Sequence, residues 1–163
     1  WLFTPPAVTA AALLAKRTMD LTTSPLLQAG LALFLREGSY DRHLRRVLKE
    51  LEARLVCAER AFAKHLPEGS SVAPCEGGFL LWVTLPDSID SAALLPEAKA
   101  AGVVYAPGEH FQPDGRRSSS LRISVAQTST AEIERGARLL GQVARAALPR
   151  GVKRARPAEV VHA

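Results

Sequence analysis

Arg122 is a single cation in a run of small and apolar residues, and such an arginine can bind a carboxylate. The pattern predicts a strand over Leu121–Val125, whose alternation places Arg122 beside Ser124 and Ala126, opposite the apolar residues. The planar guanidinium can hold a carboxylate through two parallel hydrogen bonds. On spacing alone, a surface arginine paired with a nearby acid is the alternative interpretation.

Two turns contain glycine where the backbone could approach a ligand. Pro107-Gly108 follows a short apolar run, and glycine permits both close approach and a positive φ. An ordinary turn after a strand explains this pair equally well. Gly77-Gly78 precedes a strand and is typical of a turn or bulge, since its spacing does not fit a phosphate-binding loop.

Other reactive groups are not arranged for chemistry. Neither the histidines nor Cys57 and Cys75 follow metal-ligand spacing, and the absence of a C-x-x-C pair favours a reduced, cytosolic protein. A Schiff-base lysine requires a desolvated or charge-crowded pocket. The lysines instead fall on polar helix faces or in the tail: Lys16, Lys49, Lys64, Lys99 and Lys153. We therefore expect no catalytic residue and no metal ligand in this chain.

Composition indicates an ordinary globular protein. The chain has 163 residues, 47% hydrophobic and 23% charged, enough for one core. Its net charge of +5 is spread over a helix, a turn and the tail with few aromatic residues between, which favours a solvated surface over a nucleic-acid site. No apolar run could cross a bilayer and the first residues do not form a signal peptide. We expect a cytoplasmic protein without membrane contact.

The first part of the chain predicts helices only. They span about 4–17, where Thr4 is a candidate cap, then 26–36, then Tyr40–His65, and the segment 18–24 is rich in hydroxyl groups that favour turns. The second helix is apolar almost all round, which is typical of burial in a core or against a partner chain. The third would be roughly 39 Å long, so we expect it to bridge two structural units.

Beyond His65 the apolar period changes and a small unit of strands and helices is predicted. The strand over Phe79–Leu85 has apolar residues on both faces, so we expect both faces to be covered. Ser129 and Glu132 form a capping-box pattern. Pro96 should either kink its helix or mark that helix's true first turn. The remaining predictions are strands over 71–73 and 103–105, helices over 90–101 and 131–147, and a mobile tail from Pro149.

Six segments in this order resemble the class I/II aminotransferases, pyridoxal-phosphate (PLP) enzymes of fold type I. The closest likeness is to 2-aminoadipate-like aminotransferases and to the aminotransferase-like domain of MocR-type (GntR family) regulators. The matching segments are Asp20-Leu21-Thr22-Thr23-Ser24 with Gln28, Phe34 to Arg46, Glu76 to Trp82, Gly102-Val103 with Pro107-Gly108 and Phe111, Leu121-Arg122-Ile123-Ser124, and Glu132-Ile133 with Gly136.

The resemblance implies an α/β fold made of four parts. Residues 1–38 would end the large, cofactor-binding domain, 39–66 would be the inter-domain helix, 67–148 the small domain with a short sheet, and 149–163 a disordered tail. It also implies that Arg122 and Gly108 bind the substrate, and that Thr23 and Ser24 lie near the cofactor phosphate.

The same resemblance implies a cofactor and partners. PLP would be the cofactor, with an amino acid and a 2-oxo acid as substrates and a homodimer as the assembly. The Schiff-base lysine and the aspartate that pairs with the pyridine nitrogen would lie upstream of these residues. We therefore expect the chain to be the C-terminal part of a larger enzyme and to be inactive alone.

Three functions stay open at this point. The intact protein could be an aminotransferase, or a PLP-sensing regulator that binds DNA only if a winged-helix domain precedes these residues. A plain interaction domain would explain the composition, but not the ordered set of segments.

Overall fold

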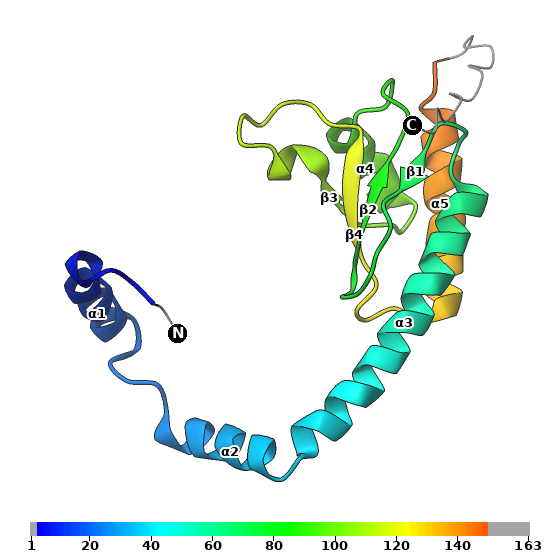
Figure 1. Ribbon diagram of the computed structural model, residues 1–163. Helices are drawn as coiled ribbons and strands as arrows, with labels where there is room; N and C mark the ends of the chain where they lie inside the picture. The colour runs from blue at the N-terminus through cyan, green and yellow to red at the C-terminus, as the bar shows by residue number, and fades with distance from the viewer. Residues whose placement is uncertain (1–2, 150–163) are drawn as a thin grey trace, which may run out of the picture. The chain divides into compact units, whose positions relative to one another are not determined.

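The computed structural model describes residues 3–149, which form two compact units with a boundary between Val47 and Leu48 (Figure 1). Residues 150–163, nearly all of the predicted tail, lie outside the described residues. None of the described helices is long and apolar enough to cross a membrane.

The first unit contains α1 (Pro6–Asp20), α2 (Pro25–Arg36) and the start of α3 (Ser39–His65). Proline opens both α1 and α2, as its fixed φ allows. The prediction that Thr4 caps α1 is wrong, since the cap position falls on Pro5, and α1 continues to Asp20 instead of ending near Arg17. Within the described chain, no residue of α1 or α2 is buried.

Helix α3 is 27 residues long and crosses the boundary between the two units. Its buried residues recur at steps of three and four in its second half, at Leu55, Ala58, Ala61 and Phe62. Only this half of the helix therefore contributes to the core. The finer domain boundaries at residues 38, 66 and 148 stay predictions.

The second unit contains a four-stranded antiparallel sheet in the order β1-β2-β4-β3. Its strands are β1 (Ser71–Val72), β2 (Leu80–Thr84), β3 (Ala106–Pro107) and β4 (Ser120–Ser124). The prediction of a strand over 103–105 is wrong. The Val103 amide donates to the Ala98 carbonyl of the preceding helix, and the chain first pairs with β4 at Ala106.

Two helices complete this unit, α4 (Ser91–Ala100) and α5 (Thr130–Ala146). The Asp90 carboxylate caps α4 by accepting from the amides of Ala92 and Ala93. The capping box of α5 forms as predicted between Ser129 and Glu132. Pro96 lies inside α4 and does not mark its first turn, because the Asp90 cap sets the start five residues earlier.

The core lies on one face of the sheet. Alternate strand residues such as Leu81, Val83 and Leu121 are buried there against α3, α4 and α5. The prediction that both faces of β2 are covered is wrong for the described residues. Leu80 is 38% exposed and Trp82 is only half-buried.

Candidate functional site

The candidate site lies on the open face of the sheet. Strand β4 pairs with β2 and β3 so that Arg122 is directly opposite Trp82 on one side and Ala106 on the other. Directly paired residues point to the same face, so these three side chains form a row across the sheet. Leu121 and Ile123 point to the opposite face and are buried in the core, so packing fixes the orientation of Arg122.

A short 3-10 helix, η1 (Gly108–Phe111), brings a second aromatic ring to this row. The Cζ atom of Arg122 lies 4.6 Å from the centre of the Phe111 ring. The Phe111 ring in turn meets the Trp82 ring edge-on, with 5.4 Å between ring centres. Arg122 is thus stacked against an aromatic ring that a second ring supports.

Arg122 has no acidic partner in the part of the chain that the structure describes. Among residues 3–149, no carboxylate oxygen lies within 4.0 Å of its guanidinium nitrogens, whereas Arg117 pairs with Asp90 at 3.1 Å. Burial of a charge is offset by an anionic partner, and the Arg122 guanidinium is half-buried. The arrangement therefore suits an anionic ligand such as a carboxylate.

Gly108 lies beside this row, at the join between β3 and η1. It is buried, and its amide donates to the Oγ atom of Ser91 over 3.3 Å. A Cβ atom at this position would lie 2.5 Å from the Oγ of Ser118 and 2.6 Å from the carbonyl oxygen of Ser120. The structure thus gives Gly108 a packing role, which lets η1 lie close against β4.

Thr23 and Ser24 lie in the first unit, between α1 and α2. The Thr23 hydroxyl accepts from the Lys16 ammonium at 3.0 Å, and its carbonyl accepts from the Gln28 side chain. Ser24 occupies the N-cap position of α2, but its side chain makes no capping hydrogen bond. Both residues are exposed in the described chain.

The described lysines all lie on the surface of the chain. Every lysine within residues 3–149 is exposed, and Lys16 and Lys64 pair with the carboxylates of Asp20 and Glu134. None of these amines has the desolvated surroundings that a Schiff base requires. The same residues contain no group of three side chains that could hold a metal ion.

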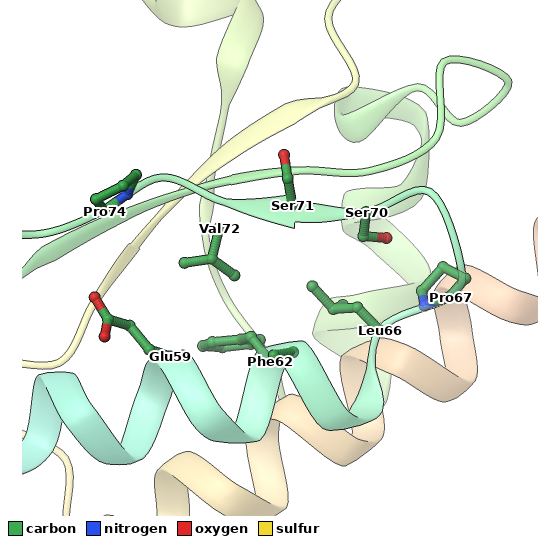
Figure 2. Close-up of a pocket in the computed structure, with 9 residues that line it drawn as sticks. Glu59, Phe62, Leu66, Pro67, Ser70, Ser71, Val72 and Pro74 are labelled. Atoms are coloured by element: carbon green, nitrogen blue, oxygen red, sulfur yellow. The ribbon is translucent and has the colours of Figure 1, made fainter. Parts of the chain in front are cut away.

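One hollow of the second unit is lined by residues other than Arg122. It has a volume of about 460 Å³ and lies between the last turns of α3 and strand β1 (Figure 2). Phe62, Leu66 and Val72 point toward one another there, and the Ser70 hydroxyl has no hydrogen-bond partner among the described residues. Glu59 is the one ionisable residue among the described residues that line this hollow. The hollow therefore lacks a cluster of ionisable groups.

Comparison with known families identifies the chain. The family model described as aminotransferase class I and II matches residues 1–140. The chain belongs to this family. The predicted resemblance is confirmed, and so is the predicted α/β fold of the fold type I aminotransferases.

Relatives of two kinds are similar to this aminotransferase-family chain. It is 28% identical to aromatic-amino-acid aminotransferase 1 of Thermococcus litoralis, over 79% of the chain and 31% of that protein. It is 29% identical to the uncharacterised HTH-type transcriptional regulator YdcR of Escherichia coli, over 76% of the chain and 26% of that protein. The chain thus spans less than a third of the length of these relatives.

A solved structure shows the same fold. The α-aminoadipate aminotransferase LysN of Thermus thermophilus, complexed with N-(5'-phosphopyridoxyl)-L-leucine, is 26% identical with a TM-score of 0.77. The match covers 88% of this chain and 37% of that one.

Sequence reasoning singled out Arg122 but assigned no role to Phe111 or Trp82. The structure brings both rings to the guanidinium. Trp82 could have been found by pairing the two strands in register, because a strand pairing fixes which residues share a face. Phe111 could not have been found in this way, since its position depends on the path of η1.

Proposed function

We propose that the intact protein is a PLP-dependent aminotransferase in which Arg122 binds the α-carboxylate of the substrate. The observation that carries the proposal is a half-buried guanidinium on an open sheet face, stacked on an aromatic ring and lacking an acidic partner among residues 3–149. Membership of the family supports the reaction, which moves an amino group between an amino acid and a 2-oxo acid.

In this proposal the residues of the chain bind and orient the substrate, and they do not carry out the chemical step. When bound, PLP supplies the electron sink for the reaction. Arg122 would orient the substrate by fixing its carboxylate, which raises the effective concentration of the reacting groups. We propose that Gly108 shapes the edge of this site and that Thr23 and Ser24 lie near the cofactor phosphate, while the Schiff-base lysine lies upstream in the longer protein.

The domain assignment belongs to the same proposal. Residues 1–38 would complete the large domain, 39–66 would connect the domains and 67–148 would form the small domain, in a homodimeric cytoplasmic enzyme. The leucines of α2 support a dimer, since six apolar side chains of this helix are exposed in the described chain. Sedimentation analysis of the full-length protein tests the assembly, and a monomer at micromolar concentration would refute it.

The carboxylate assignment is tested by substituting Arg122→Ala in the full-length protein. We expect KM for the amino acid to rise roughly 30-fold or more, since losing one partner of a charge-assisted contact costs about 2 kcal/mol or more. PLP absorbance should be unchanged. Arg116→Ala is the matched control, because Arg116 is exposed in a loop. An unchanged KM for Arg122→Ala would refute the assignment.

A PLP-sensing regulator of the MocR type is the second candidate. It is favoured by the match to YdcR, which carries the description HTH-type transcriptional regulator. The sequence upstream of these residues discriminates between the candidates. A helix-turn-helix with a basic wing, together with specific DNA binding and no turnover, would favour the regulator.

A further inference from the structure

We propose that Phe111, supported by Trp82, is a positioning residue that orients the Arg122 guanidinium for the substrate carboxylate. This inference rests on the proposed function and adds a role for two residues that do not bind the carboxylate themselves. It starts from the contact of the Arg122 Cζ with the Phe111 ring at 4.6 Å.

Stacking leaves the binding edge of the guanidinium available. The Phe111 ring attracts the guanidinium through its π face, whereas the N–H donors point outward in the guanidinium plane. The contact with Phe111 thus holds Arg122 without a hydrogen-bond acceptor that would occupy its donors. Neither Phe111 nor Trp82 carries an acceptor that would compete for these donors.

An aromatic support differs from an acidic one in its effect on charge. A neighbouring carboxylate would also hold Arg122, but it would neutralise the guanidinium and compete with the substrate for the same donors. A ring holds the side chain and leaves its positive charge intact. The absence of a carboxylate within 4.0 Å of Arg122 among residues 3–149 matches this arrangement.

The Phe111 ring is the group against which the structure places the Arg122 guanidinium. The neighbours of Arg122 in the row are Trp82 and Ala106, and the methyl group of Ala106 is too small to support a guanidinium. A free arginine side chain has about 2 kcal/mol of rotamer entropy to lose on binding. Phe111 restricts these rotamers before the substrate arrives, and Trp82 holds the Phe111 ring by an edge-on contact.

The backbone holds Phe111 in place through Gly108. Since a Cβ at Gly108 would collide with the Ser120 carbonyl of β4, glycine is what lets η1 lie against the strand that carries Arg122. The Oγ atom of Ser91 stabilises the same turn by accepting a hydrogen bond from the Gly108 amide. The path from Gly108 to the ring is one turn of 3-10 helix, so a small shift at the turn would move the ring.

The test uses steady-state kinetics of the full-length protein with substitutions at Phe111. Phe111→Leu should raise KM for the amino acid about 3- to 30-fold, the range expected from losing a cation–π contact, with kcat changed less than twofold. Phe111→Met, which keeps the volume but not the π face, should behave in the same way. Phe111→Tyr should restore KM to within about twofold, because it keeps the ring.

A matched control and a double substitution separate positioning from general damage. Phe79→Leu removes an exposed ring that makes no stacking contact with Arg122, and it should leave KM unchanged. In an Arg122→Ala background, Phe111→Leu should have no further effect on KM, because Phe111 acts through the guanidinium.

Two outcomes would overturn the inference and leave the carboxylate assignment standing. One is an Arg122→Ala variant with raised KM beside a Phe111→Leu variant with unchanged KM. The other is an additive effect of Phe111→Leu in the Arg122→Ala background. An unchanged KM in Arg122→Ala would instead refute the proposed function itself.

Discussion

Ser91 links three parts of the second unit through hydrogen bonds in the interior. It is fully buried, its hydroxyl donates to the Ser118 carbonyl at 2.8 Å, and it accepts from the Gly108 amide. Its own carbonyl accepts from the buried Tyr105 hydroxyl, whose pKa is raised by burial and by the nearby Asp90 charge. Ser91 thus connects the start of α4 to Ser118, just before β4, and to Gly108, the first residue of η1.

Replacing Ser91 by alanine should destabilise this unit. The Ser91→Ala change would leave the Gly108 amide without its partner in a buried position, which costs about 1–3 kcal/mol. Urea unfolding should show the loss as a lower midpoint. Ser88→Ala, at an exposed position nearby, serves as the control and should leave the free energy of unfolding within about 0.5 kcal/mol of that of the unaltered protein.

Glu132 should make stability depend on pH. Hydrogen bonds from the amide and the hydroxyl of Ser129 lower the Glu132 pKa below its ordinary value of 4.5. Because the folded-state pKa is the lower one, this stabilisation is present above pH 4.5 and is lost as pH falls through the lowered value.

The substitution Glu132→Gln should therefore reduce the fall in the urea midpoint between pH 5 and pH 3. Part of the fall should remain, because a hydrogen bond from His65 lowers the Glu134 pKa in the same direction. Identical pH profiles for the Glu132→Gln variant and the unaltered protein would contradict this account of the capping box.

At the scale of elements, a glycine sets how closely α5 approaches the end of α3. Gly141 of α5 is buried against the His65 carbonyl at the last residue of α3, and a Cβ there would overlap it. The Arg145 guanidinium donates to the same carbonyl. The two helices lie side by side at this point (Figure 1). This contact sets the spacing between α3 and α5, two of the helices that pack on the buried face of the sheet.

Two glycine substitutions on α5 should therefore have opposite signs. Gly141→Ala should destabilise the protein by about 1–3 kcal/mol, as overpacking does. Gly136→Ala meets no atom within 4 Å and should stabilise it by roughly 1 kcal/mol through helix propensity. Urea unfolding of both variants checks the pair, and a stabilised Gly141→Ala would show that the helices separate without cost.

At the scale of the whole molecule, the core belongs to the second unit. Within residues 3–149, every buried hydrophobic residue lies at Leu55 or beyond, and the first unit exposes leucines on both α1 and α2. Burial of apolar area is the main source of folding free energy. The two units should therefore differ in their ability to fold alone.

A protein of residues 48–149 should unfold cooperatively in urea, with a near-ultraviolet circular dichroism signal from Trp82. A peptide of residues 3–47 should show no cooperative transition, because none of its helical residues in α1 or α2 is buried. Cooperative unfolding of the peptide would contradict this division of stability.

Local rules accounted for the elements whose signals are local. The bounds of α2 and α3 and the capping box of α5 agree with prediction within a residue or two, because caps and periodicity act over a few residues. The third strand was placed too early, since the pattern could not reveal that the Val103 amide closes α4. Coverage of β2 was overestimated, because an apolar strand face says nothing about which element packs on it.

The sequence likewise predicted the part of the candidate site that depends on local pattern, but not the part that depends on tertiary contacts. Alternation along β4 correctly separated Arg122 from the core residues Leu121 and Ile123. The contact with Phe111 depends on the turn at Gly108, where a tertiary approach of η1 to Ser120 decides the geometry. A sequence pattern does not encode such an approach.

The alternation along β4 has an evolutionary consequence. Odd-numbered positions such as Leu121 and Ile123 tolerate little change without unfolding, whereas even-numbered positions such as Arg122 and Ser124 can be altered with little effect on folding. If Arg122 binds the substrate as proposed, selection can therefore change ligand recognition and thermal stability independently within five consecutive codons. A saturation library across 120–124 should divide into two interleaved phenotypes, abundance at one parity and affinity at the other.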